Sequence, residues 1–107
     1  MKYNKLVRDN IPAIIASRGE QPITRLLDVD EYRHELRRKL QEEVNEFCRA
    51  GRPEELADIL EIVYALALEA GISPTQLETI RHQKLVERGG FNQRIFLIET
   101  RPGDTAG

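Results

Sequence analysis

Two long helical segments joined by a very short turn constrain the fold of this chain most strongly. Apolar residues recur at helical spacing from about residue 29 to 50 and again from 53 to 70, and the turn at Gly51-Arg52-Pro53 is all that separates them. Gly commonly ends a helix, and Pro is favoured in the first turn of the next. A connection this short makes the two helices antiparallel neighbours. We therefore expect the fold to be built around a helical hairpin.

Start and stop signals predict where these and two further helices lie. The first helix is expected from Ile11 to Arg18, capped by Asp9 or Asn10 and followed by Gly19. An Asp-x-x-Glu capping pattern at 28–31 opens the second helix. A Ser-x-x-Gln capping box at 73–76 opens the fourth, and Gly89-Gly90 closes it.

Two further segments are expected to be extended. They are Pro22 to Leu27 and Arg94 to Glu99, and the second contains the β-rich run Ile95-Phe96-Leu97-Ile98. We expect these segments to pair. The predicted fold is therefore all-α, an antiparallel bundle of about four helices with a small two-stranded β element formed by 22–27 and 94–99. We expect one domain over residues 1–100 and a flexible tail over 101–107.

Composition narrows the classes of function. Of the 107 residues, 40% are hydrophobic and 32% are charged, and the formal net charge of −2 provides no bulk attraction for nucleic acid or an anionic membrane. Cys48 is the only cysteine, so neither an intrachain disulfide nor a cysteine zinc site can form. The start of the chain has no secretory pattern, and no apolar stretch is long enough to span a bilayer. We expect a cytoplasmic protein with neither nucleic acid nor membrane as a partner.

Acidic residues interrupt the apolar faces of both central helices. In the second helix Glu43 falls within or at the edge of the buried stripe, and Glu46 lies about 60° further round. In the third helix Glu55 opens an apolar row and Asp58 lies one turn on. The residues that define the two rows are Leu36, Leu40, Val44 and Phe47, and Ile59, Ile62 and Leu66. The two carboxylate pairs should therefore face each other near the turn.

Four carboxylates in one partly buried place repel one another unless cations neutralise them. An all-oxygen donor set favours a hard ion, so the sequence predicts Mg²⁺ first and Mn²⁺ second. The alternative is that these acids form a solvated face that pairs with neighbouring basic residues, or complement a helix N-terminus.

Basic residues could supply the second half of a nucleotide site. They are Lys5, Arg8, Lys39, Lys84 and Arg88. Cations beside a carboxylate-bound metal suit a polyphosphate, because the metal takes some of its oxygens and Lys and Arg take the rest. Salt bridging and solubility are the alternative explanation for each of them.

Four motifs in order along the chain resemble one known family. KLVRDNIP, KLQEEVNEF, EELADILEIVYALA and ERGGFNQRIFL, spread over about residues 2–99, are similar to segments of compact MazG-like proteins. These belong to the all-α nucleoside triphosphate pyrophosphohydrolase superfamily, which is related to phosphoribosyl-ATP pyrophosphohydrolase. The resemblance implies Mg²⁺-dependent cleavage of a nucleoside triphosphate between its α and β phosphates, an activity suited to clearing non-standard nucleotides. It also implies a homodimer or homotetramer.

The family signature E-E-x-x-E followed by E-x-x-D falls on residues 42–46 and 55–58. The resemblance implies that Glu43, Glu46, Glu55 and Asp58 bind the metal, while Glu42 or Glu46 serves as general base. Only eight residues separate Glu46 from Glu55, fewer than in the larger MazG proteins, so the substrate pocket is expected to differ. The alternatives are phosphoribosyl-ATP hydrolysis, and a helical protein that binds a nucleotide or a partner without turnover.

Overall fold

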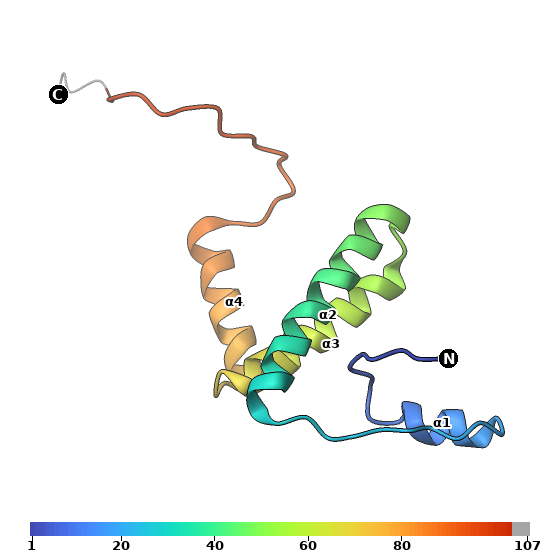
Figure 1. Ribbon diagram of the computed structural model, residues 1–107. Coiled ribbons are helices and arrows are strands. Elements are labelled where there is room, and N and C mark those ends of the chain that lie inside the picture. Colours follow the sequence, from blue (N-terminus) through green and yellow to red (C-terminus); the bar gives the residue numbers. More distant parts are fainter. Residues whose placement is uncertain (104–107) are drawn as a thin grey trace.

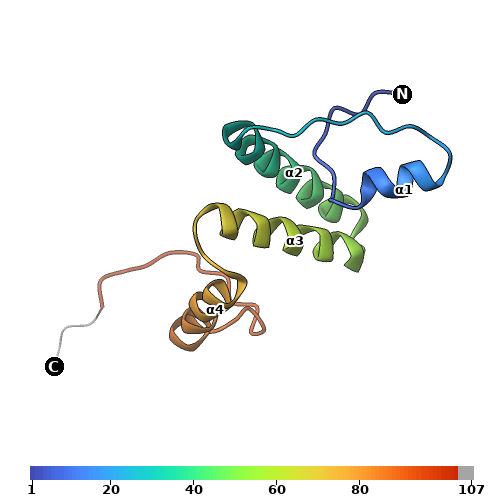
Figure 2. The same cartoon turned by 90° about the horizontal axis from the view of Figure 1, so that it is seen from below.

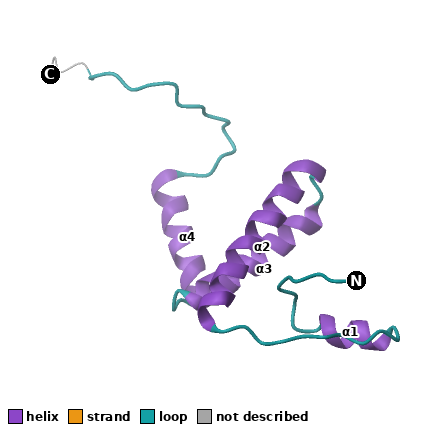
Figure 3. Cartoon of the chain, viewed as in Figure 1, coloured by secondary structure: helices purple, strands orange, loops and turns teal. Residues whose placement is uncertain are grey.

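The computed structural model describes residues 1–103, which form four α-helices joined by loops (Figures 1 and 3). The helices are α1 (Ile11–Ser17), α2 (Val29–Ala50), α3 (Pro53–Glu69) and α4 (Pro74–Arg88). Each lies within one or two residues of its predicted bounds. Residues 104–107 lie outside the described residues, and with them most of the predicted tail at 101–107.

The predicted capping boxes form at the starts of α2 and α4, whereas Asn10, at the N-cap of α1, makes no side-chain capping hydrogen bond. At the start of α2, Asp28 accepts a hydrogen bond from the amide of Glu31, whose side chain accepts one from the Asp28 amide in return. Ser73 and Gln76 form the same reciprocal pair at the start of α4. Gly51 ends α2 with φ +68°, a left-handed conformation that residues with a Cβ rarely adopt. The direction change between α2 and α3 is thus encoded locally.

The core lies between α2 and α3, which run antiparallel and side by side in both views (Figures 1 and 2). Leu36 of α2 is 3% exposed, and Ile62 and Ala67 of α3 are each 6% exposed. Leu36 and Ile62 belong to the two apolar rows expected from the sequence, whereas Ala67 lies one residue past Leu66 of the α3 row. Burial of a leucine-sized side chain contributes about 1.5–3 kcal/mol, so this seam is the main source of tertiary stability.

Helices α1 and α4 are more loosely attached. Among the described helices, contacts are confined to α2 with α3 and to α3 with α4, and α1 lies apart from the hairpin (Figures 1 and 2). The α4 helix starts at the C-terminal end of α3, the end remote from the Gly51 turn (Figure 1). None of the helices within residues 1–103 combines the length and apolar character that a membrane crossing demands.

The predicted β element within one chain is wrong. Residues 22–27 and 95–99 are extended but lie apart, Arg94 has a left-handed φ of +60°, and there is no β-strand in the described part of the chain (Figure 3). The first segment leads from α1 to the start of α2 and the second leads away from α4, so the hairpin core stands between them (Figure 1). The β-rich composition favours extended backbone, but pairing also needs proximity, which four helices in this arrangement do not provide.

Candidate functional site

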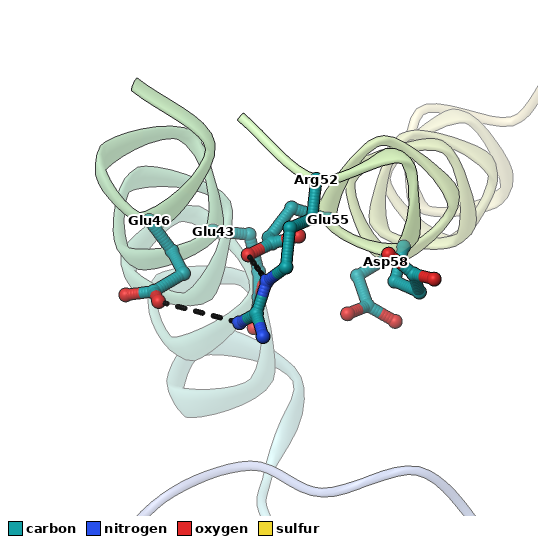
Figure 4. A pocket seen from close by; sticks show the side chains of 6 residues that line it. Glu43, Glu46, Arg52, Glu55 and Asp58 are labelled. Atoms are coloured by element: carbon teal, nitrogen blue, oxygen red, sulfur yellow. Dashed lines mark hydrogen bonds and ion pairs between the residues drawn. The ribbon is translucent and has the colours of Figure 1, made fainter. Parts of the chain in front are cut away.

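A hollow of about 360 Å³ opens where α2 ends and α3 begins (Figure 4). All four carboxylates of the two predicted pairs line it. The other two lining residues come from the turn between the helices and from the first turn of α3. The lining residues are Glu43, Glu46, Arg52, Glu54, Glu55 and Asp58. The hairpin therefore brings together at one end five carboxylates and one guanidinium.

The helix geometry sets how deeply each acid lies. The Glu55 side chain is 4% exposed, because it continues the apolar row of α3 that packs against α2. Glu43 lies at the edge of the α2 stripe, with its side chain 20% exposed, whereas Glu46 is 34% and Asp58 43% exposed. The carboxylates thus form a gradient from the buried seam to the solvent.

Arg52 lies between the two helices and joins their acids (Figure 4). Its Nε is 3.1 Å from Glu55 Oε1, and its Nη2 is 3.8 Å from Glu46 Oε1. Hydrogen bonding to Glu55, together with the charges of Glu55, Glu46 and Glu54, raises the pKa of the Arg52 guanidinium. Arg52 therefore holds positive charge at the centre of the acidic cluster.

One oxygen of this cluster has no partner. Glu55 Oε2 is buried and receives no hydrogen bond from any described residue, while Oε1 of the same carboxylate is bound by Arg52. A buried carboxylate oxygen without a donor or cation carries an uncompensated desolvation cost. The site is thus electrostatically incomplete at this atom.

Two predicted basic residues reach the rim of the hollow. Arg8, in the segment before α1, places its Nη2 2.7 Å from Asp58 Oδ1. Lys39 lies one turn before Glu43 on α2, and its Nζ is 3.8 Å from Glu43 Oε1. The pairing on α2 is local, as predicted. The contact between the N-terminal segment and α3 joins residues that are 50 positions apart in the sequence.

The other predicted site residues do not line this hollow. Glu42 is turned toward Arg38, with its Oε1 3.4 Å from the Arg38 Nε. The Nζ of Lys5 lies 5.5 Å from the centre of the Tyr3 ring. Lys84 and Arg88 lie on α4, beyond the far end of α3 (Figure 1). Their roles in catalysis or phosphate binding stay predictions.

Sequence reasoning missed Arg52 and Glu54. Arg52 occupies the turn between helices that each carry an acidic pair, so a side chain of its length reaches acids on both helices. Its position between the pairs was the available signal. Glu54 is exposed and lies in the first turn of α3, where an acid complements the positive end of the helix dipole, so the sequence offers a simpler explanation for it than a place in the hollow.

The donor chemistry of the hollow suits a hard cation, because every acidic group in it offers carboxylate oxygens. In the conformation described, however, no three His, Cys, Asp or Glu side chains among residues 1–103 are grouped so that they could hold a metal ion. Arg52 instead supplies the positive charge between Glu46 and Glu55. Metal binding would therefore require the Arg52 side chain to move aside and the acids to converge.

Comparisons of the chain with protein-family models, with curated proteins and with solved structures find no match. The function must therefore be argued from the chemistry of the hollow itself.

Proposed function

We propose that the chain is a Mg²⁺-dependent nucleotide pyrophosphohydrolase that cleaves a nucleoside triphosphate between its α and β phosphates. The unpartnered buried oxygen of Glu55, set among four other carboxylates, carries the proposal. A buried acid with one compensated and one uncompensated oxygen is suited to a cation as second partner. The resemblance to compact MazG-like proteins adds the substrate class.

The negative charge of the hollow favours a substrate that binds through a metal cation over an anion that binds directly. Five carboxylates and one guanidinium line it, so a free triphosphate would be repelled. A divalent cation that binds both the acids and the phosphate oxygens reverses this repulsion. An acidic hollow and a polyanionic substrate are therefore compatible only through metal.

Glu43, Glu46, Glu55 and Asp58 are the proposed ligands of Mg²⁺, with Mn²⁺ as a substitute. When bound, the metal would neutralise phosphate oxygens and lower the pKa of an attacking water. Glu46 lines the hollow and is about one-third exposed, which suits acceptance of a proton from that water. Glu42 is the weaker general-base candidate, because its carboxylate pairs with Arg38 outside the hollow.

Basic residues at the rim would hold the phosphates. Arg8 and Lys39 pair with Asp58 and Glu43 in the structure, and their charges become available to a phosphate when a metal takes over the acids. Lys5, Lys84 and Arg88 complete the proposed substrate-binding set. We further propose that the active form is a homodimer or homotetramer, because Leu56, Leu60 and Leu68 of α3 are each about half exposed or more.

Pyrophosphate release from a panel of triphosphates, with Mg²⁺ and with a chelator, tests the proposed activity. Phosphoribosyl-ATP belongs in the panel, since activity on it alone would identify the histidine-pathway type of reaction. Magnesium titration by calorimetry, on the parent and on Glu55→Gln, tests the site separately from turnover. A matched control is Glu61→Gln, which changes an exposed acid of α3 outside the hollow.

A non-catalytic interaction protein is the second candidate. Arg8, Lys39 and Arg52 already pair with acids of the hollow, which is the arrangement expected of structural ion pairs. This candidate predicts no pyrophosphate release from any triphosphate and no Mg²⁺ binding that Glu55→Gln removes.

A further inference from the structure

The extended segments 22–27 and 94–99 carry apolar side chains that this chain leaves uncovered. Ile23 is 90% and Leu26 98% exposed in the first segment. In the second, the four apolar residues of 95–98 are 74–87% exposed. Two separate β-rich segments exposed to this degree are unusual for a protein that functions as a monomer.

Their backbones are equally unpartnered. The last backbone hydrogen bond before the first segment is donated by the Glu20 amide to the Ile15 carbonyl. The last one before the second segment is donated by the Arg94 amide to the Phe91 carbonyl. Between these limits no backbone bond is made within residues 21–27 or 95–99 of the described chain. Such segments present free donors and acceptors to another extended chain.

The dimensions of the chain show how much surface is left to cover. The radius of gyration is 20.0 Å, against about 13 Å for a compact domain of this length. The accessible surface is 9917 Å², against roughly 6,100 Å² for a compact monomer of 12.3 kDa. The excess is larger than the roughly 800 Å² per partner that a stable protein interface buries. A second copy of the chain can supply that cover.

The first segment is held in place as a docking edge. Arg25 forms two hydrogen bonds with Glu31, of 2.7 and 3.2 Å, which fix the end of the segment to the first turn of α2. Its other end is tied to α1 through Glu20 and Ile15. The second segment instead projects from α4 beyond Gly89 and Gly90 (Figures 1 and 2). One segment is therefore a fixed edge and the other a projecting arm.

The two segments are also complementary in charge. Arg25 is the one charged residue of segment 22–27 and Glu99 is the one charged residue of residues 95–99, and each forms an ion pair within its own chain, with Glu31 and with Arg101. A parallel alignment that places Ile23 opposite Leu97 also places Arg25 opposite Glu99. Cross-strand opposite charges and apolar pairs stabilise a two-stranded ribbon. If each segment instead paired in parallel with its own copy, like charges would face each other.

We infer that two copies of the chain exchange these segments, so that residues 95–99 of each copy pair as a strand with residues 22–27 of the other. Two-fold symmetry forms the pairing twice and uses every segment. The β ribbon expected from sequence then exists between copies rather than within one. This inference concerns assembly and does not depend on whether the hollow turns over a nucleotide.

Crosslinking of unlike copies distinguishes exchange from pairing within one chain. In a Cys48→Ala background, Thr24→Cys protein is mixed with size-tagged Thr100→Cys protein and treated with a flexible bis-maleimide, which tolerates differences in register. We expect a crosslinked product that contains one copy of each. The doubly substituted chain should likewise give dimers in preference to an internal loop.

Two results would overturn the inference. One is an internal loop as the main product of the doubly substituted chain, which would show that the arm folds back on its own copy. The other is a yield of mixed product no higher than in urea, where the copies are unfolded. Single variants treated alone give the background for both comparisons.

Proline substitutions test the backbone hydrogen bonds separately from apolar contact. Alternate amides of a strand point to opposite sides, so one of Leu97→Pro and Ile98→Pro must remove an amide that faces the partner. We expect that variant to raise the dimer dissociation constant in sedimentation at least about tenfold more than the matched alanine variant does. Equal dissociation constants for proline and alanine at both positions would contradict strand pairing.

Discussion

The α2–α3 hairpin and the two extended segments, 22–27 and 94–99, differ in what holds them in place. Residues in the hairpin have partners from a neighbouring helix, and Leu36 is buried to 3% exposure. Most apolar residues of segments 22–27 and 94–99 are exposed in the described chain, and Leu26 is 98% exposed. The difference arises from distance along the sequence. The hairpin partners are joined by a turn, whereas residues 22–27 and 94–99 are separated by the whole helical core.

The hairpin and the extended segments each contain side chains in an unfavourable environment, but of opposite kinds. In the hairpin the mismatch is a buried acid, Glu55, with an oxygen that lacks a partner. In the arms it is apolar surface in contact with water. A buried acid calls for a cation or donor, whereas exposed apolar strands call for another chain. The molecule thus indicates a small charged ligand at one place and a macromolecular partner at another.

The largest expected effect comes from removing one acid of the hollow. We expect Glu43→Ala or Asp58→Ala to lower Mg²⁺-dependent pyrophosphate release by at least about 100-fold, because each removes a proposed metal ligand. Metal-free stability should hold or rise, since the cluster of like charges becomes smaller. Turnover and urea unfolding are measured on both variants, with Glu61→Gln as the control. Unfolding with Mg²⁺ binding intact would show that these acids are structural.

The next effect contrasts a leucine of the hairpin with one of the arms. We expect Leu36→Ala to lower the free energy of unfolding by about 2–5 kcal/mol, because it leaves a cavity in the seam. Leu26→Ala should change it by less than about 0.5 kcal/mol at dilutions where the chain is monomeric. Urea unfolding over a range of protein concentrations provides both values. A large effect of Leu26→Ala in the monomer would mean that the arm packs on its own chain.

The helices were predictable from sequence because their determinants are local. Asp28 with Glu31, Ser73 with Gln76, and Gly51 fix helix ends through contacts within a few residues, and the structure reproduces them. Burial of Glu55 was predictable for a similar reason, since helical periodicity places it on the apolar row. These features need no knowledge of the rest of the fold.

The remaining features depend on distant parts of the chain. The pairing of Arg8 with Asp58 spans 50 residues, and nothing in either segment specifies the other. The error in the β element has the same origin, because composition predicts an extended segment but not its partner. The role of Arg52 was not predicted because it depends on acids of two different helices, Glu46 and Glu55, lying close together.

A smaller effect is expected from Arg52, which competes with a metal for the acids. Arg52→Ala should lower the melting temperature of the metal-free protein, because Glu55 loses its only hydrogen-bond donor within the described chain. The same change should tighten Mg²⁺ binding roughly tenfold by removing a cation from the cluster. Calorimetric titration and thermal unfolding measure the two effects. Arg81→Ala is the control, because Arg81 pairs with Glu78 on α4, outside the hollow. Weaker Mg²⁺ binding in Arg52→Ala would show that Arg52 supports the ligands rather than competing with a metal.

The smallest effect concerns the ion pair that fixes the first arm to α2. Hydrogen bonding to Arg25 lowers the pKa of Glu31 from 4.5 to about 2 in the folded chain, with a further contribution from the Asp28 amide. Since the folded pKa lies below the unfolded one, the pair stabilises the fold above about pH 4.5, and this contribution is lost as the pH falls from about 5 to 2. Glu31→Gln keeps an acceptor for the Asp28 amide but cannot ionise, so its urea midpoint should fall less steeply over this range than that of the parent. Arg25→Gln should flatten the profile in the same way, because it removes the partner that lowers the pKa of Glu31. Parallel profiles for the parent and Glu31→Gln would show that the Arg25 pair does not form in solution and that the arm is free at this end.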